Sequence, residues 1–218
     1  MRKDFLKTIL RALDDHLTTS LYEKGARTKQ TYEQSVNFIR RHLSYSIITL
    51  KFTLRLHNSH PLKLHLGCGD QYIDGYVNID LRKTTATDFV CRIENLPYPN
   101  DSAEIIELYH VIEHLPRHDL PAAMREWYRV LSPGGKLIIE CPDFDAAAKE
   151  YVAGNEERLE NIFGLQRFPG DVHLFGYNFR RLKNLLEDAG FLAIEQREPR
   201  DYHTKDEPCL RVEASKEQ

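Results

Sequence analysis

The chain has 218 residues, of which 41% are hydrophobic and 29% charged, so it has room for one α/β domain and an extension. No run approaches the ~20 apolar residues of a membrane span, and acidic residues near the N-terminus argue against an export signal. The four cysteines form no C-x-x-C pair, which argues against a zinc knuckle or a disulfide framework and fits a reducing compartment. We therefore expect a cytoplasmic protein.

The net charge of −3 is unevenly distributed. Residues 1–63 contain 12 Lys and Arg and 5 Asp and Glu, which gives +7, and the remainder carries −10. A basic arm on an acidic body can contact phosphate groups of lipids or nucleic acid, but solvated helix faces explain the same charges, and we favour that interpretation. The sequence leaves peripheral membrane contact and self-association open. A nucleic-acid partner is not expected.

Residues 1–60 are predicted to form a helical N-terminal extension. Apolar residues at helical spacing mark one helix in residues 3–23, and a second stripe consists of Tyr32, Val36, Ile39 and Leu43. Residues 44–57 fit either a continued helix or an alternating strand. The second domain is expected to cover residues 61–218.

From residue 61 the pattern alternates between strands and helices, which predicts a parallel sheet. The expected strands are residues 63–66, 76–79, 88–91, 104–109 and 136–140, followed by an antiparallel pair at 191–197 and 209–214. Helices are expected at 119–131, from 143 onward and at 179–189, with Asn178 as an N-cap and Gly190 as the stop.

Two predicted crossovers are too short for a helix. Only residues 70–75 separate a glycine turn from the second strand, and residues 80–87 are similarly few, whereas a helical crossover needs about a dozen residues. Because parallel sheets are buried on both faces, we expect the uncovered face to be apolar. We predict that residues 28–57 pack against it, or against the same face of a partner chain.

A strand, a glycine turn, a second strand and a terminal carboxylate occupy residues 63–80, KLHLGCGDQYIDGYVNID. Glycines let the backbone approach a ligand closely, and Asp80 can accept the hydroxyls of a ribose. This layout predicts a nucleotide site.

Further segments follow in order: LPYPNDSAEII, HVIEHL and REWYRVLSPGGKLIIECPD. Together with LHLGCG and Asp80 they span roughly residues 62–145 and resemble the class I S-adenosylmethionine (SAM) dependent methyltransferases. The resemblance implies a Rossmann-like α/β fold, mostly parallel with a closing antiparallel hairpin, and SAM as cofactor. LHLGCGDQYIDGYVNIDL is similar to bacterial enzymes linked to surface-polysaccharide and lipopolysaccharide synthesis, which implies O-methylation of a glycan or other small polar acceptor.

The resemblance also implies cofactor contacts. Gly67, Cys68 and Gly69 would pass under the methionine part, with Gln71 in place of the family's third glycine. Asp80 would bind the ribose and Leu81 would flank the adenine. The adenine edge would meet the Ile93 backbone and Glu94, although many relatives have an acidic residue where this chain has Arg92. Tyr109 and His110 would border the methionine end.

An oxygen acceptor needs a base to take its proton. The candidates at strand ends are His110, His114 and Asp143, joined by His173 and Tyr177 from the segment after the fifth strand. His118 is interpreted as a surface residue.

The HVIEH cluster raises a second possibility. If residues 110–114 are helical, His110, Glu113 and His114 share one face and can bind a metal. The cluster resembles the E-x-x-E-H of metal-dependent small-RNA 2′-O-methyltransferases, with His110 replacing the first Glu and His173 as a further ligand. Because E-H is also common in metal-free relatives, we predict no metal.

Two rival functions remain beside catalysis of glycan O-methylation. One is a SAM-binding interaction module without turnover, and the other is a metal-dependent RNA 2′-O-methyltransferase-like enzyme. A nicotinamide oxidoreductase is disfavoured, since LPYPNDSAEII and LSPGGKLIIE have no counterpart there. Turnover of SAM separates an enzyme from a module.

Overall fold

The computed structural model describes residues 61–218. The predicted helical extension, the stripe from Tyr32 to Leu43 and the ambiguous residues 44–57 lie outside the described residues. The domain boundary near residue 60 and the packing of residues 28–57 therefore stay predictions. Within residues 61–218, no helix is long and apolar enough to cross a membrane.

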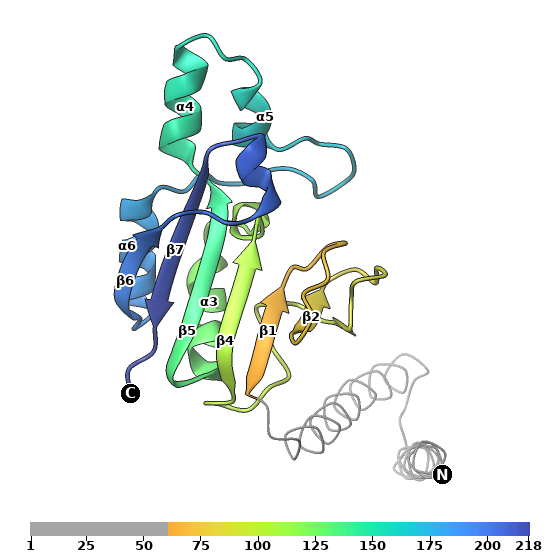
Figure 1. Cartoon of the computed structure of the whole chain (residues 1–218), viewed down its shortest axis with the longest axis vertical. Coiled ribbons are helices and arrows are strands. Elements are labelled where there is room, and N and C mark those ends of the chain that lie inside the picture. Colours follow the sequence, from red (N-terminus) through yellow and green to blue (C-terminus); the bar gives the residue numbers. More distant parts are fainter. Residues whose placement is uncertain (1–60) are drawn as a thin grey trace, which may run out of the picture. The chain divides into compact units, whose positions relative to one another are not determined.

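A seven-stranded sheet forms the centre of the described domain (Figure 1). The strand order is β3-β2-β1-β4-β5-β7-β6, in which the first five are parallel and β7 runs antiparallel to both β5 and β6. The strands are β1 (Leu62–Leu66), β2 (Val77–Asp80), β3 (Phe89–Val90), β4 (Ala103–Tyr109), β5 (Leu131–Pro142), β6 (Leu192–Arg197) and β7 (Cys209–Ser215). This sheet confirms the predicted Rossmann-like methyltransferase fold class.

Four α-helices belong to the described part: α3 (Leu120–Val130), α4 (Phe144–Val152), α5 (Arg158–Phe163) and α6 (Phe179–Asp188). The side chain of Asn178 accepts a hydrogen bond from the backbone N–H of Arg181, which confirms the predicted N-cap of α6. Gly190 follows α6 at a positive φ of +97°, as expected for a helix stop. The short helix α5 and two 3₁₀ turns, η1 (Ile112–His114) and η2 (Tyr202–Lys205), were not predicted.

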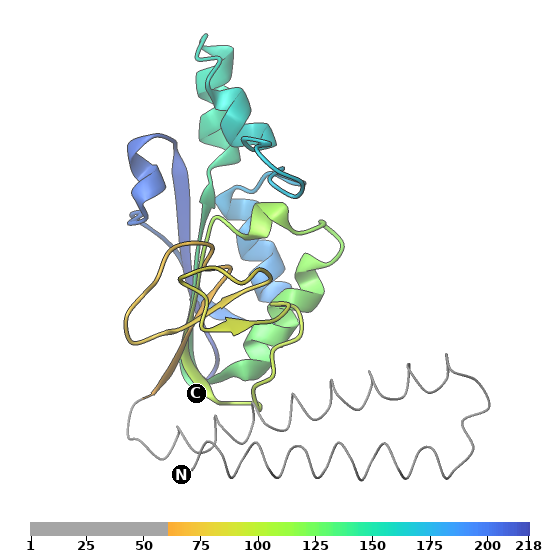
Figure 2. The same cartoon turned by 90° about the vertical axis from the view of Figure 1, so that its right-hand side faces the viewer.

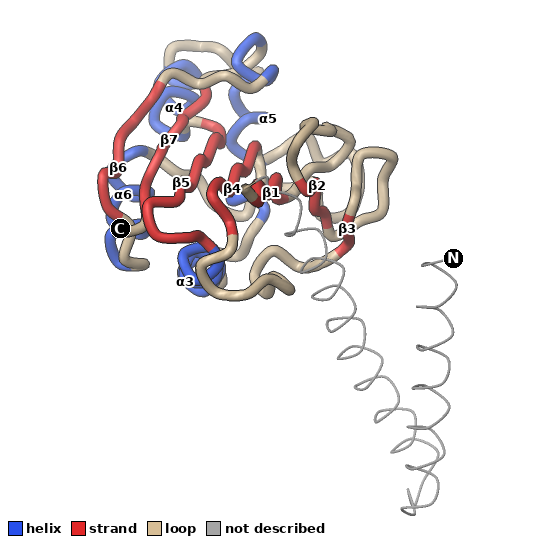
Figure 3. The backbone as a smooth tube through the Cα atoms, turned by 60° about the horizontal axis from the view of Figure 1, so that its bottom comes forward, coloured by secondary structure: helices blue, strands red, loops and turns tan. Residues whose placement is uncertain are grey.

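The connections on either side of β2 contain no helix, as their lengths predicted. Figure 3 shows that β2 and β3 are flanked by loops. The β1–β2 connection is closed by a turn in which Gln71 N donates to Cys68 O at 2.8 Å. The glycine turn is thus joined to β2 by a short loop.

One face of the sheet carries the apolar core. The strand register places Leu64, Leu66, Ile106, Leu108, Leu137, Ile139, Val212 and Ala214 on this face, and all are buried. The helices α3 and α6 cover it (Figure 2). Trp127 of α3 is fully buried, and its Nε1 donates to the Ile93 carbonyl at 2.9 Å, which connects the core to the loop before β4.

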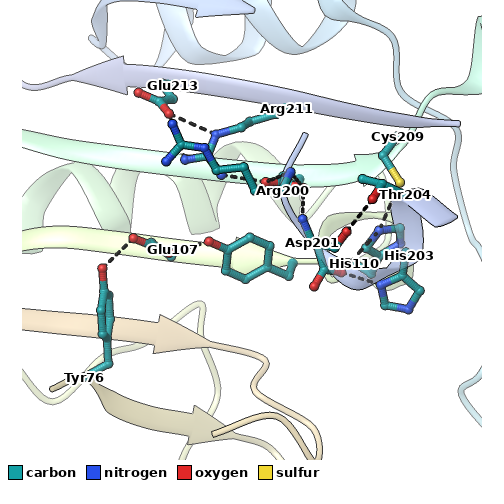
Figure 4. Close-up of polar contacts among 12 residues, drawn as sticks. Tyr76, Glu107, His110, Arg200, Asp201, His203, Thr204, Cys209, Arg211 and Glu213 are labelled. Atoms are coloured by element: carbon teal, nitrogen blue, oxygen red, sulfur yellow. Dashed lines mark hydrogen bonds and ion pairs between the residues drawn. The ribbon is translucent and has the colours of Figure 1, made fainter. Parts of the chain in front are cut away.

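The opposite face is largely polar, and in residues 61–218 no α-helix lies over it (Figures 1 and 2). The Glu107 carboxylate accepts hydrogen bonds from the hydroxyls of Tyr76 and Tyr109, each at 2.5 Å. Arg211 pairs with Glu140 at 2.5 Å on the adjacent strands (Figure 4). The expectation of an apolar uncovered face is therefore wrong, because charged side chains and tyrosine hydroxyls on this face pair with one another.

Candidate functional site

The turn after β1 allows its backbone to approach a ligand closely. Gly67 has φ +69° and Gly69 has φ +52°, a region that side chains disfavour. A Cβ at Gly67 would lie 2.4 Å from Cγ2 of Val111, so this position also lacks space for a side chain. The backbone N–H of Cys68 donates to the Ile79 carbonyl at 2.9 Å, which fixes the turn against β2.

Replacing Gly67 by Ala is expected to weaken binding of S-adenosylhomocysteine at least tenfold and to destabilise the fold by about 1–3 kcal/mol, from backbone strain together with the Val111 contact. Gly75→Ala is the matched control, because Gly75 has φ +80° but a Cβ added there would meet no atom within 4 Å. Calorimetry and urea unfolding measure both effects. Equal losses in the two variants would remove the Val111 contact from the explanation.

Asp80 ends β2 with its carboxylate held by the backbone. Gly69 N donates to Oδ2 at 2.8 Å, and Arg82 N donates to Oδ1 at 2.7 Å. The residue is 7% exposed and borders the cleft described below. Because a carboxylate can accept about four hydrogen bonds, the two remaining lone-pair positions are available to ligand hydroxyls.

Asp80→Ala is expected to weaken binding of S-adenosylhomocysteine by about 1–3 kcal/mol, roughly 5- to 150-fold, because ligand hydroxyls and the Gly69 amide both lose their acceptor. Asp74 is an exposed acid in the connection between β1 and β2, and Asp74→Ala should leave the affinity for S-adenosylhomocysteine unchanged. Calorimetry on both variants makes the comparison. Unchanged affinity in Asp80→Ala would exclude the carboxylate from the cofactor site.

A cleft of about 1290 Å³ opens at the carboxyl ends of the parallel strands. This volume exceeds a typical small-molecule site and is enough for a cofactor and an acceptor side by side. All nine residues predicted to contact the cofactor line it, namely Gly67, Cys68, Gly69, Asp80, Leu81, Ile93, Glu94, Tyr109 and His110.

The part of the cleft around Leu81, where the sequence predicts the adenine, offers exposed apolar surface beside charged groups. Leu81 is 62% exposed beside Asp80, which leaves apolar surface for a ring to cover. The Ile93 carbonyl accepts one hydrogen bond from Trp127 Nε1 at 2.9 Å, which fixes this backbone segment at the cleft. Arg92, at a position where the resemblance implies an acidic residue, forms an ion pair with Glu94 at 2.7 Å at the rim of the cleft.

His110 follows β4 in a left-handed conformation, with φ +53°. Its Nδ1 lies 3.4 Å from carboxylate oxygens of Glu113 and Glu207, and its Nε2 lies 3.7 Å from the Cys209 sulfur. Burial lowers the pKa of His110, but the Cys209 thiol and the carboxylates of Glu113 and Glu207 outweigh burial and raise it to about 10. His110 is therefore an imidazolium at neutral pH and is not suited to be the base.

The Asp201–His203 pair lies next to His110, and sequence reasoning missed it. His203 Nδ1 contacts Asp201 Oδ2, and its ring centroid is 3.8 Å from that of His110 (Figure 4). The Glu140 carboxylate accepts from the backbone N–H groups of Arg200 and Asp201 at 3.0 Å, which anchors this loop to β5. Only the local D-x-H spacing in residues 201–203 could have suggested it.

His114 and His173 come together from distant segments. Their ring centroids are 5.0 Å apart, and both rings line the cleft. The Leu174 N–H donates to the Glu113 carbonyl at 2.7 Å, which joins the segment after α5 to the turn after β4. Burial lowers the pKa of His173, so its ring is neutral at neutral pH. His118 is 83% exposed at its side chain, which confirms its surface position.

Asp143 and Tyr177 do not line the cleft. The Asp143 carboxylate accepts from the N–H groups of Asp145 and Ala146 and caps α4. Tyr177 is 2% exposed, and its hydroxyl lies in the interior. Both were candidates because they follow β5 in the sequence. Since neither side chain lines the cleft in the structure, neither is retained as a base.

A glycine turn after β1, an acidic end to β2 and this strand order form a Rossmann-like nucleotide-binding sheet of the kind that class I methyltransferases have, which fits SAM as the cofactor. Residues 64–139 match the methyltransferase domain family. A SAM-dependent methyltransferase from Archaeoglobus fulgidus superposes with a TM-score of 0.53 at 16% identity, over 81% of this chain and 94% of that one. At this identity the likeness supports the fold alone.

Curated relatives match a shorter region. The mitochondrial 2-methoxy-6-polyprenyl-1,4-benzoquinol methylase of Gallus gallus is 30% identical over 118 residues, 47% of this chain and 35% of the relative. The ubiquinone/menaquinone biosynthesis C-methyltransferase UbiE of Vibrio vulnificus is 30% identical over 108 residues, 45% of this chain and 41% of the relative. The chain thus spans less than half the length of each relative.

Proposed function

We propose that the protein transfers the methyl group of SAM to an oxygen of a small polar acceptor, such as a sugar hydroxyl of a glycan. The observation that carries this proposal is the composition of the cleft beyond the cofactor half. His114, His173, Asp201 and His203 line the cleft beside apolar residues such as Leu165 and Phe168, so several ionisable groups are within reach of an acceptor. A polar acceptor satisfies such groups, whereas a purely apolar one leaves them unpaired.

Methyl transfer is an in-line displacement, in which the acceptor oxygen attacks the methyl carbon and the sulfur leaves with its electron pair. The protein contributes positioning and removes the acceptor proton. We assign the base to His203, since Asp201 contacts Nδ1 and leaves Nε2 as the free acceptor. The cationic His110 contributes positive charge beside the pair and does not accept the proton.

A second candidate is methylation of a ring carbon of a quinol-like acceptor, favoured by the names of the two curated relatives. Here too the acceptor carries a hydroxyl, whose deprotonation activates the ring carbon. The two candidates share the cofactor half of the site and differ in the bond formed.

The test is a SAM turnover assay with the full-length protein against sugars, glycolipids and quinols, followed by NMR of the product. A new O–CH₃ group on a sugar supports the first candidate, and a new C–CH₃ group on a ring supports the second. Binding of SAM without turnover of any acceptor class would favour a non-catalytic module.

A further inference from the structure

Phe168 is an exposed aromatic residue in the cleft. It lies in the loop between α5 and α6, far downstream of Asp80 in the sequence, and 43% of its surface is exposed although it lines the cleft. Single exposed apolar residues are common on protein surfaces, but one inside a binding cleft offers a ligand an apolar surface to cover. Its place in the cleft therefore indicates which part of a ligand it contacts.

Two contacts place Phe168 at the Asp80 end of the cleft. The Arg82 guanidinium carbon lies 5.0 Å from the centre of the Phe168 ring, which is within the range of a cation–π contact. Nε of the same guanidinium lies 3.7 Å from Asp80 Oδ1. Since Asp80 is expected to bind the ribose of SAM, the Phe168 ring borders the adenosine end of the cofactor site.

The loop that carries Phe168 is held in place by its own contacts. Gln166 N donates to the Asp171 carbonyl at 2.8 Å, and the Arg167 side chain pairs with the Asp171 carboxylate at 2.8 Å. At Gly164, where the loop begins, φ is +80° and an added Cβ would lie 2.9 Å from the Asp171 carbonyl oxygen. These contacts position the ring before a ligand binds, so less conformational entropy is lost on binding.

We propose that Phe168 packs against the adenosine part of bound SAM and, together with Leu81, forms the apolar surface at that end of the cleft. An adenine base has a flat π-face that an aromatic side chain can cover. Asp80 and the glycine turn belong to the sheet, which is the fixed platform of the cofactor site, whereas Phe168 comes from the separate segment between β5 and α6. The assignment concerns the cofactor alone, so it goes beyond the proposed function and holds for either acceptor candidate.

The same segment also reaches the acceptor side of the cleft. The His173 N–H donates to the Phe163 carbonyl at 3.0 Å, so the loop that presents Phe168 ends at a histidine that also lines the cleft. A cofactor that contacts Phe168 therefore stabilises the segment that positions His173. Because trypsin cleaves after arginine and the Arg167 side chain is 63% exposed, this stabilisation can be measured as protection from cleavage.

The test is calorimetry of the full-length protein with S-adenosylhomocysteine and with 5′-methylthioadenosine, which keeps the adenosine part and lacks the amino acid. Phe168→Ala should weaken binding of both ligands by the same factor, about 5- to 150-fold, the contribution of a base stacked on an aromatic side chain. Phe168→Tyr keeps the ring and should bind both ligands as tightly as the wild type. Phe163→Ala is the matched control, since Phe163 is exposed in the same segment but does not line the cleft.

Limited proteolysis gives a second readout on the same proteins. S-adenosylhomocysteine should slow trypsin cleavage after Arg167 in the wild type, with the fragments identified by mass spectrometry, and should protect Phe168→Ala much less.

Unchanged affinity of Phe168→Ala for both ligands would overturn the proposal. A loss for S-adenosylhomocysteine without a loss for 5′-methylthioadenosine would also overturn it, because the ring would then contact the amino-acid part of the cofactor. If Phe168→Ala does not fold, the wild type decides, since a cofactor that leaves cleavage after Arg167 unchanged does not contact this loop.

Discussion

Replacing His203 by Asn is expected to lower kcat for methyl transfer to an oxygen by about 10²- to 10⁴-fold, the usual contribution of a positioned base. The cofactor half of the cleft is formed by other residues, so affinity for S-adenosylhomocysteine should change less than twofold. Steady-state kinetics with the acceptor found by the turnover screen measures the loss. His118→Asn, at an exposed position, is the matched control.

A pH series separates loss of the base from loss of structure. Raising the pH ionises the acceptor hydroxyl without help, so the defect of His203→Asn should shrink as the pH rises. Asp201→Asn should show a smaller defect, because it disturbs the ring orientation without removing the imidazole. A defect of constant size at every pH, or no defect, would contradict the assignment of His203 as the base.

Replacing Arg211 by Met is expected to lower the free energy of unfolding by about 3–5 kcal/mol. Arg211 is 3% exposed and its partner Glu140 is 0% exposed, so the substitution leaves a buried carboxylate without its counter-charge. Glu140 also holds the loop at Arg200 and Asp201, and the variant should therefore loosen this loop. Urea denaturation of the wild type and the variant measures the difference.

The neighbouring Arg197–Glu195 pair provides the control for burial. Both of its side chains are more than half exposed, so Arg197→Met should cost about 0–1 kcal/mol. Similar losses for Arg211→Met and Arg197→Met would show that burial of the Arg211–Glu140 pair has little effect on its contribution.

The cofactor half of the site was predictable from sequence because its determinants are local. Gly67, Gly69 and Asp80 lie within 14 residues of one another, and strand periodicity places each at a strand end. The acceptor half was predictable only in part. His173 reaches His114 through α5 and a loop, and Asp201–His203 reaches His110 through the Glu140 anchor, contacts that no periodic pattern encodes.

The fold, too, was predictable where its signals are local and not where it depends on contacts between distant residues. The strand pattern predicted the sheet, since alternation and glycine stops are local signals. The prediction that the uncovered face is apolar was wrong. Lys63, Glu107 and Glu140 lie on this face and alternate with core residues along their strands. Only the register showed that Glu107 meets two tyrosines and that Glu140 meets an arginine.

The chain leaves β5 at Asp143, and Tyr177, just before α6, is joined to Asp143 by an isolated parallel bridge. Phe144 N donates to the Tyr177 carbonyl at 3.0 Å, so the two ends of the intervening segment lie side by side. The segment between Asp143 and Tyr177, which includes α4, α5 and His173, therefore begins and ends at neighbouring positions in the fold. Such a segment can be lengthened, shortened or exchanged without altering a strand, which offers a route to new acceptors on an unchanged cofactor platform.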